Sequence, residues 1–266
     1  MKRPEDYESI TTLNISSKNL TELPCLISEC KNLENLNCSF NFIKKISNLQ
    51  STLKYLDCYS NQITDLNNLQ SALKILDCGN NKLTQLDNLP PTLKELYCHD
   101  NKITHLDNLP QTLETLNCIG NKITNLYNLP PTLKILNCGY NKLTQIDNLP
   151  TTLKELYCVG NNIIQLDNLP LTLKELYCEN NEIANLDNLP PTLKILNCGY
   201  NKLTQIDNLP PTLELLYCQY NQIMHLDILP ITLKELYCIN NPLKYDFKPT
   251  IKNIRYYNNQ NNKNTL

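Results

Sequence analysis

Apolar residues recur along this chain with a period of 20 residues, which runs from Leu33 to Leu243 without a slip. When each repeat is counted from its first Leu, positions 1 and 4 are Leu, position 6 is Cys and position 9 is Asn in all eleven repeats. Position 11 is Ile or Leu, and polar residues lie between these fixed columns. A fixed period of this length indicates a repeat protein in which neighbouring units cover one another's apolar faces.

The alternation of Leu at position 4 with Cys at position 6 predicts one short, half-buried strand in each repeat. Most repeats then close with Asn-Leu-Pro, and proline at position 18 fixes φ and lacks a backbone donor. A 20-residue coil leaves little room for a helix, so we expect an extended or polyproline II return segment. The strands should stack as a parallel sheet on a concave face, with the extended segments on the convex side.

The pattern L-x-x-L-x-C-x-x-N-x-[IL] resembles the leucine-rich repeat signature, L-x-x-L-x-L-x-x-N-x-L. The resemblance covers about residues 10 to 259. The closing Asn-Leu-Pro-Pro-Thr makes the repeats most similar to the 20-residue repeats of bacterial type III effectors of the Yersinia kind, from which Cys at position 6 is a departure. The resemblance implies an α/β-class leucine-rich-repeat solenoid, a horseshoe that is in practice mostly β, with little helix.

The ends of the array depart from the pattern and are expected to cap it. Residues 1–32 would form an N-terminal cap and an atypical first repeat, with a helical turn within 25–31. The eleven regular repeats occupy 33–243. A degenerate C-terminal cap strand is expected within 244–259, and residues 260–266 are expected to form a disordered tail.

Two of the fixed columns are interpreted as a structural ladder. One Cys per strand points inward between Leu columns, so the thiols are expected to be buried small hydrophobes and not convergent metal ligands. Each Asn at position 9 can satisfy backbone groups where the coil turns, because an amide offers both a donor and an acceptor. Cys98, Cys138, Asn101 and Asn141 represent these columns.

Positions 3, 5, 7 and 8 differ between repeats and are expected to point outward from the concave sheet. Tyr is frequent at positions 5 and 8, and exposed Tyr combines a large rigid ring with a polar tip. Partner binding and simple stacking of the rings along the sheet are the two interpretations. The candidate partner-binding residues are Tyr97, Tyr140, Glu155, Tyr157, Glu175, Tyr177, Tyr200, Tyr217, Tyr220, Glu235 and Tyr237.

Charge and hydropathy limit the possible partners. Lys and Arg number 24 against 26 Asp and Glu, a balance that argues against nucleic acid and anionic membranes as partners. No apolar run is long enough to span a bilayer, and the charged N-terminal residues precede no apolar signal segment. We therefore expect a cytoplasmic protein without a signal peptide, acting in a host cytoplasm if it is viral or an effector.

The sequence contains few residue patterns typical of an enzyme active site. The three His residues do not approach one another in the repeat pattern, and phosphate-binding and dinucleotide-binding glycine motifs are missing. We expect no enzyme activity, no cofactor and no metal. The first functional hypothesis is a module that binds a partner protein or peptide on its concave face. The alternative is a structural or self-associating repeat protein without a foreign partner.

Overall fold

A computed structural model describes residues 5–67, 69, 72–226 and 229–263. The chain divides into two compact units, Met1–Asn137 and Cys138–Leu266. Both units are built from the same 20-residue coil, which contains one three-residue strand and a long return segment. Each unit is a mostly β, parallel-sheet solenoid, which confirms the fold class expected from the repeat pattern.

The first unit begins with helix α1 (Glu5–Glu8) and strand β1 (Thr12–Asn14). A 3-10 turn, η1 (Cys25–Glu29), follows β1 and lies within the expected helical segment. Six further strands then pair in parallel in chain order, and equivalent residues of successive repeats lie opposite one another. They are β2 (Asn35–Asn37), β3 (Tyr55–Asp57), β4 (Ile75–Asp77), β5 (Glu95–Tyr97), β6 (Thr115–Asn117) and β7 (Ile135–Asn137).

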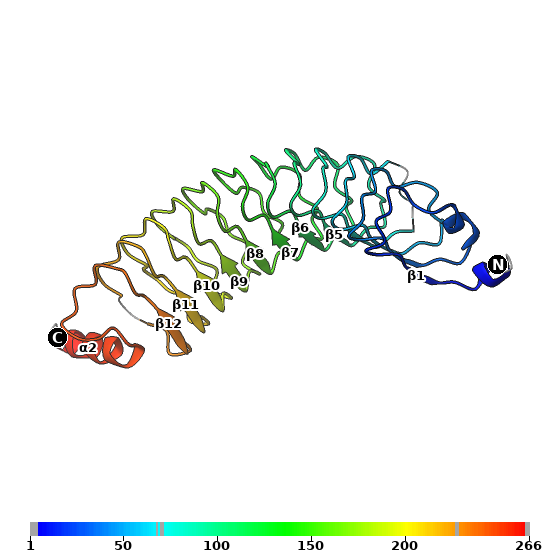
Figure 1. Ribbon diagram of the computed structural model, residues 1–266. Helices are drawn as coiled ribbons and strands as arrows, with labels where there is room; N and C mark the ends of the chain where they lie inside the picture. The colour runs from blue at the N-terminus through cyan, green and yellow to red at the C-terminus, as the bar shows by residue number, and fades with distance from the viewer. Residues whose placement is uncertain (1–4, 68, 70–71, 227–228, 264–266) are drawn as a thin grey trace. The chain divides into compact units, whose positions relative to one another are not determined.

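The second unit continues the same pattern. Its strands are β8 (Glu155–Tyr157), β9 (Glu175–Tyr177), β10 (Ile195–Asn197), β11 (Leu215–Tyr217) and β12 (Glu235–Tyr237). They pair in parallel with Leu opposite Leu at the central position, as in Leu196 opposite Leu216. In Figure 1 the arrows from β8 to β12 lie side by side along one side of these coils.

The core of both units consists of the fixed columns. The Leu side chains at position 1 and the Ile or Leu side chains at position 11 are buried along the array, as Leu93 and Ile103 illustrate. The central Leu of each strand is also buried, except at the terminal strands β1 and β12. Since a single coil cannot enclose these side chains, burial depends on the next coil, and this makes the stacking of coils the main source of stability.

The return segments contain no helix among the described residues between Lys31 and Pro249. Pro90, Pro110 and their equivalents accept a hydrogen bond from the Leu three residues later, which closes a turn just before each strand. This agrees with the expected extended return. The prolines are buried at most of these positions, because the turn folds them against the neighbouring coil.

The C-terminal end corrects one expectation. Residues 244–259 were expected to include a cap strand, but Ile251–Lys263 form helix α2. Ile254 of α2 is fully buried, and Arg255 hydrogen-bonds the carbonyl oxygens of Pro230 and Leu233. A helix can present apolar residues to one face and polar residues to the other, so it covers the last coil where the sheet has no further strand to pair with.

Helix α2 also changes the view of the expected disordered tail over 260–266. The helix extends to Lys263, so residues 260–263 are helical. Residues 264–266 lie outside the described residues.

Candidate interaction surface

The solvent-facing side of the strands is formed by the variable positions of the repeat. In β2 to β11 the central Leu is buried and its two neighbours are partly exposed, the alternation that a one-sided sheet requires. Positions 7 and 8 continue this surface where the chain leaves the strand. We call the side chains at positions 3, 5, 7 and 8 the strand face. All eleven candidate partner-binding residues named from the sequence belong to it.

Tyr hydroxyl groups on the strand face donate hydrogen bonds to Glu at position 3. The Tyr97 hydroxyl donates to Glu95 at 2.9 Å, and the Tyr157 hydroxyl lies 3.2 Å from Glu155 and 3.3 Å from Glu175. Burial, together with the hydrogen bond to Glu95, raises the pKa of Tyr97 to about 12. Burial and then the two carboxylates raise the pKa of Tyr157 as well. The raised pKa keeps both phenols protonated at neutral pH, and the hydrogen bonds to Glu fix the positions of the two rings.

The Tyr rings of the second unit stack in pairs along the sheet. Tyr157 and Tyr177 have ring centroids 4.7 Å apart with an interplanar angle of 12°, and Tyr217 and Tyr237 are 4.8 Å apart at 7°. These separations match the spacing between neighbouring strands of a parallel sheet. Stacking therefore accounts for one face of each ring. The opposite faces of each pair take part in no ring stacking among the described residues.

A second row of aromatic side chains lies at position 8, where the backbone adopts the left-handed conformation. Tyr140, Tyr200 and Tyr220 have φ of 49°, 54° and 55°, and their side chains remain 58%, 45% and 44% exposed. The same turn position is Gly120 and Gly160 in two other coils. A bulky residue with this φ costs roughly 1–2 kcal/mol, which the turn itself does not require.

Two glycines at position 7 allow neighbouring side chains to lie over the backbone. A Cβ atom at Gly79 would lie 2.3 Å from the ring of His99, which stacks on Tyr59 with centroids 5.4 Å apart. A Cβ atom at Gly199 would lie 2.7 Å from the amide nitrogen of Gln219. The strand face is therefore uneven, with side chains from one coil covering the glycine of the previous coil.

The Cys column at position 6 packs in the core, and the Asn column at position 9 hydrogen-bonds the backbone. Cys98 and Cys138 are fully buried, and burial raises the pKa of the Cys98 thiol far above its ordinary value. The Asn101 amide nitrogen donates to three backbone carbonyl oxygens, while its oxygen accepts from the Leu83 N–H at 2.9 Å. The Asn141 amide nitrogen donates to the carbonyl oxygens of its own coil.

Comparison with known proteins agrees with this construction. A family model described as Leucine Rich repeats (2 copies) matches residues 51–91. YopM from Yersinia enterocolitica superposes with a TM-score of 0.71 and 30% sequence identity over 87% of this chain and 60% of its own. The repeats therefore resemble those of bacterial leucine-rich repeat effectors. Leucine-rich repeat proteins generally mediate protein–protein interactions.

Two further solved structures, both of bacterial proteins, resemble this chain. YopM from Yersinia pestis, a leucine-rich effector protein, has a TM-score of 0.71 at 29% identity, over 87% of this chain and 78% of its own. The functional domain of InlJ from Listeria monocytogenes includes a cysteine ladder; it has a TM-score of 0.59 at 26% identity, over 90% of this chain and 69% of its own. Curated protein sequences give no match. The chain spans 60% of the length of the Yersinia enterocolitica protein.

Two structural columns of the repeat were missed by sequence reasoning. Asn at position 16, as in Asn88 and Asn108, has φ near +57° and forms the turn before Leu-Pro. Thr at the last position, as in Thr112, donates its hydroxyl to the carbonyl oxygens of Pro91 and Leu93, which lie 21 and 19 residues earlier in the chain. Their regular recurrence was the available signal, since Asn tolerates this conformation and a Thr hydroxyl can satisfy a backbone group.

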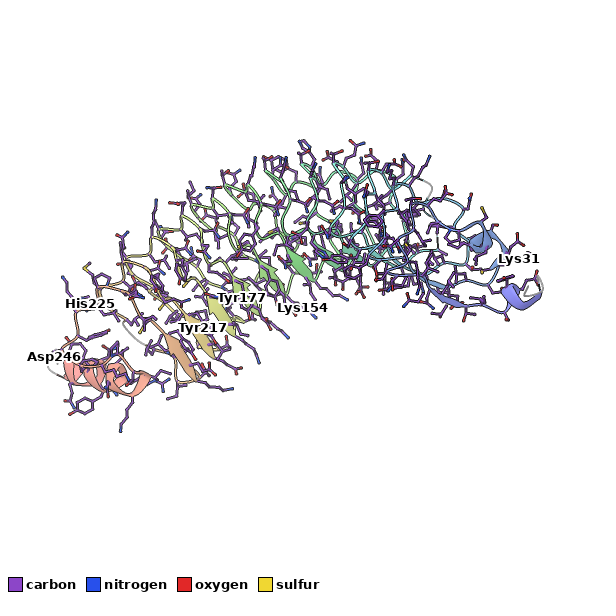
Figure 2. The ribbon with its side chains drawn as sticks, viewed as in Figure 1. Lys31, Lys154, Tyr177, Tyr217, His225 and Asp246 are labelled. Atoms are coloured by element: carbon purple, nitrogen blue, oxygen red, sulfur yellow. The ribbon has the colours of Figure 1, made fainter. Side chains whose placement is uncertain are left out.

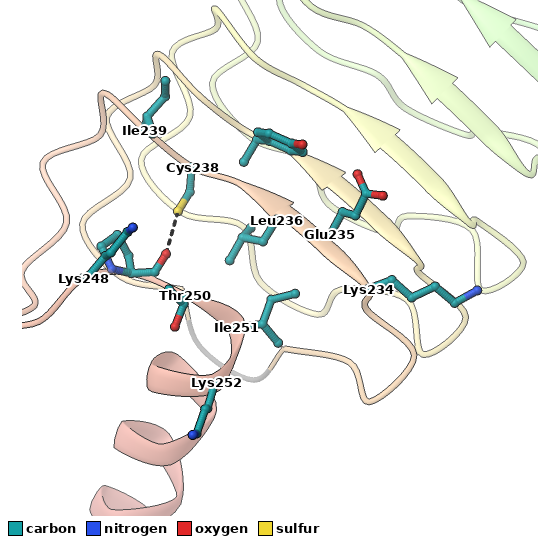
Figure 3. Close-up of a pocket in the computed structure, with 11 residues that line it drawn as sticks. Lys234, Glu235, Leu236, Cys238, Ile239, Lys248, Thr250, Ile251 and Lys252 are labelled. Atoms are coloured by element: carbon teal, nitrogen blue, oxygen red, sulfur yellow. Dashed lines mark hydrogen bonds between the residues drawn. The ribbon is translucent and has the colours of Figure 1, made fainter.

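The C-terminal end of the repeat array leaves a cavity of about 770 Å³ between β12 and the segment that enters α2. Figure 3 shows Ile251 and Leu236 beside this cavity. The Cys238 thiol donates a hydrogen bond to the Pro249 carbonyl oxygen, 3.9 Å away. Ile239, at the end of the last strand, is 64% exposed. This end of the second unit is therefore less completely covered than the interior coils.

The described residues offer neither a cluster of metal ligands nor a membrane-spanning helix. Among the described residues, no group of three or more His, Cys, Asp or Glu side chains is placed to hold a metal ion. Within the same residues, no helix has both the length and the apolar character needed to cross a bilayer.

Proposed function

We propose that this repeat protein is a non-enzymatic module that binds a partner protein or peptide on its strand face. The observation that carries the proposal is the placement of exposed Tyr140, Tyr200 and Tyr220 at left-handed turn positions. Their side chains cost folding free energy at positions that Gly120 and Gly160 occupy elsewhere, and strain of this kind concentrates at functional sites. Exposed Tyr is also among the residues enriched in protein interfaces.

The difference between fixed and variable columns also supports the proposal. The buried positions repeat almost without change, whereas the strand face differs from coil to coil. A surface that only stacked on itself would need no such variation. A surface that selects one partner needs a specific arrangement of rings, carboxylates and gaps.

The proposal is tested by affinity capture from a cell lysate with the full chain as bait. A variant carrying Tyr157→Asn, Tyr177→Asn, Tyr217→Asn and Tyr237→Asn should lose the captured partner. Asn is already present at this position in several coils, so the variant is expected to fold, and circular dichroism checks that it does.

A matched control separates the strand face from exposed aromatic surface in general. Tyr127 and Tyr256 are 54% and 68% exposed but do not belong to the strand face. The Tyr127→Asn, Tyr256→Asn double variant should capture the partner as the native chain does. Equal capture by the four-residue variant and the native chain would refute binding on the strand face.

Self-association is the second candidate, and the open end of the second unit favours it. Ile231 and Ile239 are 86% and 64% exposed there, and β12 presents an edge without a following strand. Sedimentation equilibrium of the native chain should then show a mass that increases with concentration, and Ile239→Lys should abolish the increase. A monomer mass at all concentrations would exclude this candidate.

A further inference from the structure

A gap in the Tyr row of the second unit forms a slot between two aromatic rings. Tyr177 on β9 and Tyr217 on β11 both lie opposite Asn197 on the intervening strand β10. One face of each ring is occupied, because Tyr177 stacks on Tyr157 and Tyr217 on Tyr237. The remaining faces look toward each other across Asn197. Figure 2 labels both rings on the strand side of the coils.

The width of this slot suits one planar group. Two strand spacings separate equivalent atoms of Tyr177 and Tyr217, which corresponds to about 9.6 Å. A flat group needs about 3.5–4 Å on each side, or about 7–8 Å in total, so the gap admits one such group and not two. The Tyr177 and Tyr217 hydroxyl groups interact electrostatically across the gap, which contributes to the raised pKa of Tyr177 after burial and Glu175. We call Tyr177, Tyr217 and Asn197 the Tyr slot.

Two buried acceptor atoms without partners lie beside the Tyr slot. Glu179 and Gln219 follow Tyr177 and Tyr217 by two residues on the same side of the sheet, with Gly199 between them. The Glu179 Oε2 atom and the Gln219 Oε1 atom are buried and accept no hydrogen bond in the described structure. Buried acceptors of this kind are costly unless a donor reaches them. A ligand that carries several N–H donors would therefore satisfy both the Glu179 and the Gln219 oxygen.

The strand face is acidic, and this favours a positively charged ligand. Positions 3, 5, 7 and 8 of all eleven repeats contain no Lys or Arg. The same positions contain carboxylates, and burial raises the pKa of Glu179, as expected for a carboxylate that no cation accompanies. A cationic partner group would satisfy this surface. The carboxylates are Asp57, Asp77, Glu95, Asp100, Glu155, Glu175, Glu179 and Glu235.

We propose that the Tyr slot, with Glu179 and Gln219 beside it, binds the guanidinium group of an arginine side chain presented by a partner protein. A guanidinium is planar, stacks on aromatic faces, and carries five N–H donors that suit carboxylate and amide oxygens. An ammonium group is a compact, strongly hydrated charge and fills a flat slot less well. This inference rests on the proposed function and names the side chain that the strand face recognises.

The direct test is an NMR titration of the full chain with the blocked amino acid N-acetyl-arginine methylamide. The amide signals of Asn197 and Gly199 should shift and saturate. The corresponding citrulline compound has the same shape without the charge and should give no saturable shift. The lysine compound should bind at least about 3-fold more weakly, since it cannot stack between the rings.

A substitution that fills the slot provides the matched pair of variants. Asn197→Tyr should join the two stacked pairs into one continuous row and lower arginine affinity at least about 10-fold. The variant should fold, because Tyr occupies this position in neighbouring coils. Asn117→Tyr makes the same change on β6 in the first unit, and arginine affinity should stay within about 2-fold of the native value.

A second pair of variants tests the carboxylate. Glu179→Gln removes the buried charge and should weaken arginine binding at least about 5-fold. Glu182→Gln removes an equal charge from the same coil, where Glu182 pairs with Lys202, and should change affinity less than about 2-fold. Equal effects of the two substitutions would point to general charge attraction and would contradict a role for Glu179.

The outcomes separate this inference from the proposed function. Absence of saturable shifts, or equal shifts with citrulline or in Asn197→Tyr, overturns the arginine site. If a lysate partner is still captured through the strand face in that case, the proposed function stands without an arginine. If arginine binds the slot but Asn197→Tyr captures the same partner as Asn117→Tyr, the partner does not use the slot.

Discussion

At the scale of single residues, the fixed columns are explained by backbone chemistry. Asn101 shows the pattern most fully, because its one amide group serves four backbone groups in two adjacent coils. Its nitrogen donates to the carbonyl oxygens of Cys78, Cys98 and His99, and its oxygen accepts from the Leu83 N–H. No other side chain of this size offers both functions, and this accounts for Asn in every repeat.

Asn101→Ala is therefore expected to destabilise the first unit by about 3 kcal/mol, since it leaves several buried polar groups without partners. Chemical denaturation followed by circular dichroism measures the change. Asn125→Ala replaces a partly exposed Asn in the next coil and should change the free energy of unfolding by less than about 0.5 kcal/mol. Similar values for the two variants would contradict the role assigned to the Asn column.

The Cys column makes the free energy of unfolding depend on pH in the alkaline range. Burial raises the pKa of Cys38 and Cys118 from 9.0 to about 12. The unfolded chain loses these protons from about pH 9, whereas the folded chain keeps them to about pH 12. The thiol contribution to the free energy of unfolding is thus complete below pH 9 and decreases as pH rises from 9 toward 12.

The melting temperature should accordingly change little through thiol ionisation from pH 7 to 8.5 and fall at higher pH. Circular dichroism melts between pH 7 and 10.5 measure this dependence. Cys118→Ala should show a shallower fall than the native chain, because it removes one shifted group. A slope unchanged by this substitution would show that other groups control alkaline stability.

At the scale of elements, the ends of the array differ from its interior. An interior strand is covered by coils on both sides, whereas among the described residues β12 pairs with β11 alone. Helix α2 covers that end through buried Ile254, while Tyr245 hydrogen-bonds both the N–H and the carbonyl oxygen of Leu226. The cap is therefore an element with its own packing and not a further repeat.

Ile254→Ala should destabilise the second unit by about 2–4 kcal/mol, because it leaves a cavity under α2. Hydrogen exchange should show increased opening of α2 and β12 first, with less change at β9. Tyr256→Ala, at a residue that is 68% exposed on the same helix, serves as the control and should change little. Uniform protection in Ile254→Ala would mean that α2 does not hold the end of the array.

At the scale of the whole molecule, a net charge of −2 conceals a separation of charge by repeat position. Lys residues gather at position 2, where Lys94 and Lys134 both pair with Glu114, and Lys194 and Lys234 with Glu214. The strand face contains carboxylates and no Lys or Arg in the eleven repeats. The composition is thus nearly neutral while one surface is acidic.

A partner that binds the strand face should therefore associate more slowly as salt increases. Raising NaCl from about 0.05 M to about 0.5 M shortens the screening length several-fold and should lower the association rate. Surface plasmon resonance with the captured partner measures this rate. A variant with Glu155→Gln, Glu175→Gln and Glu235→Gln should depend less on salt, and an identical dependence would argue against an acidic binding face.

The 20-residue repeat period was enough to predict most of the fold. The columns of Leu and Cys predicted the strands and their inward and outward faces, and the recurring Pro predicted the extended return, because each depends on local geometry that repeats along the chain. The eleven strand-face residues could be named for the same reason, since side chains alternate across a strand. The ends were predicted less well, because α2 forms over residues with no repeat pattern and little apolar character.

The sequence by itself thus determined the coil, its register and the surface on which a partner is proposed to bind, since identical coils must stack in register to bury their Leu columns. Tertiary structure alone decided the details that give that surface its chemistry. The facing rings of Tyr177 and Tyr217, and the unpaired oxygen of Glu179, arise between side chains of different coils. Such contacts depend on rotamers and on which neighbour is small, and no local pattern in the sequence specifies them.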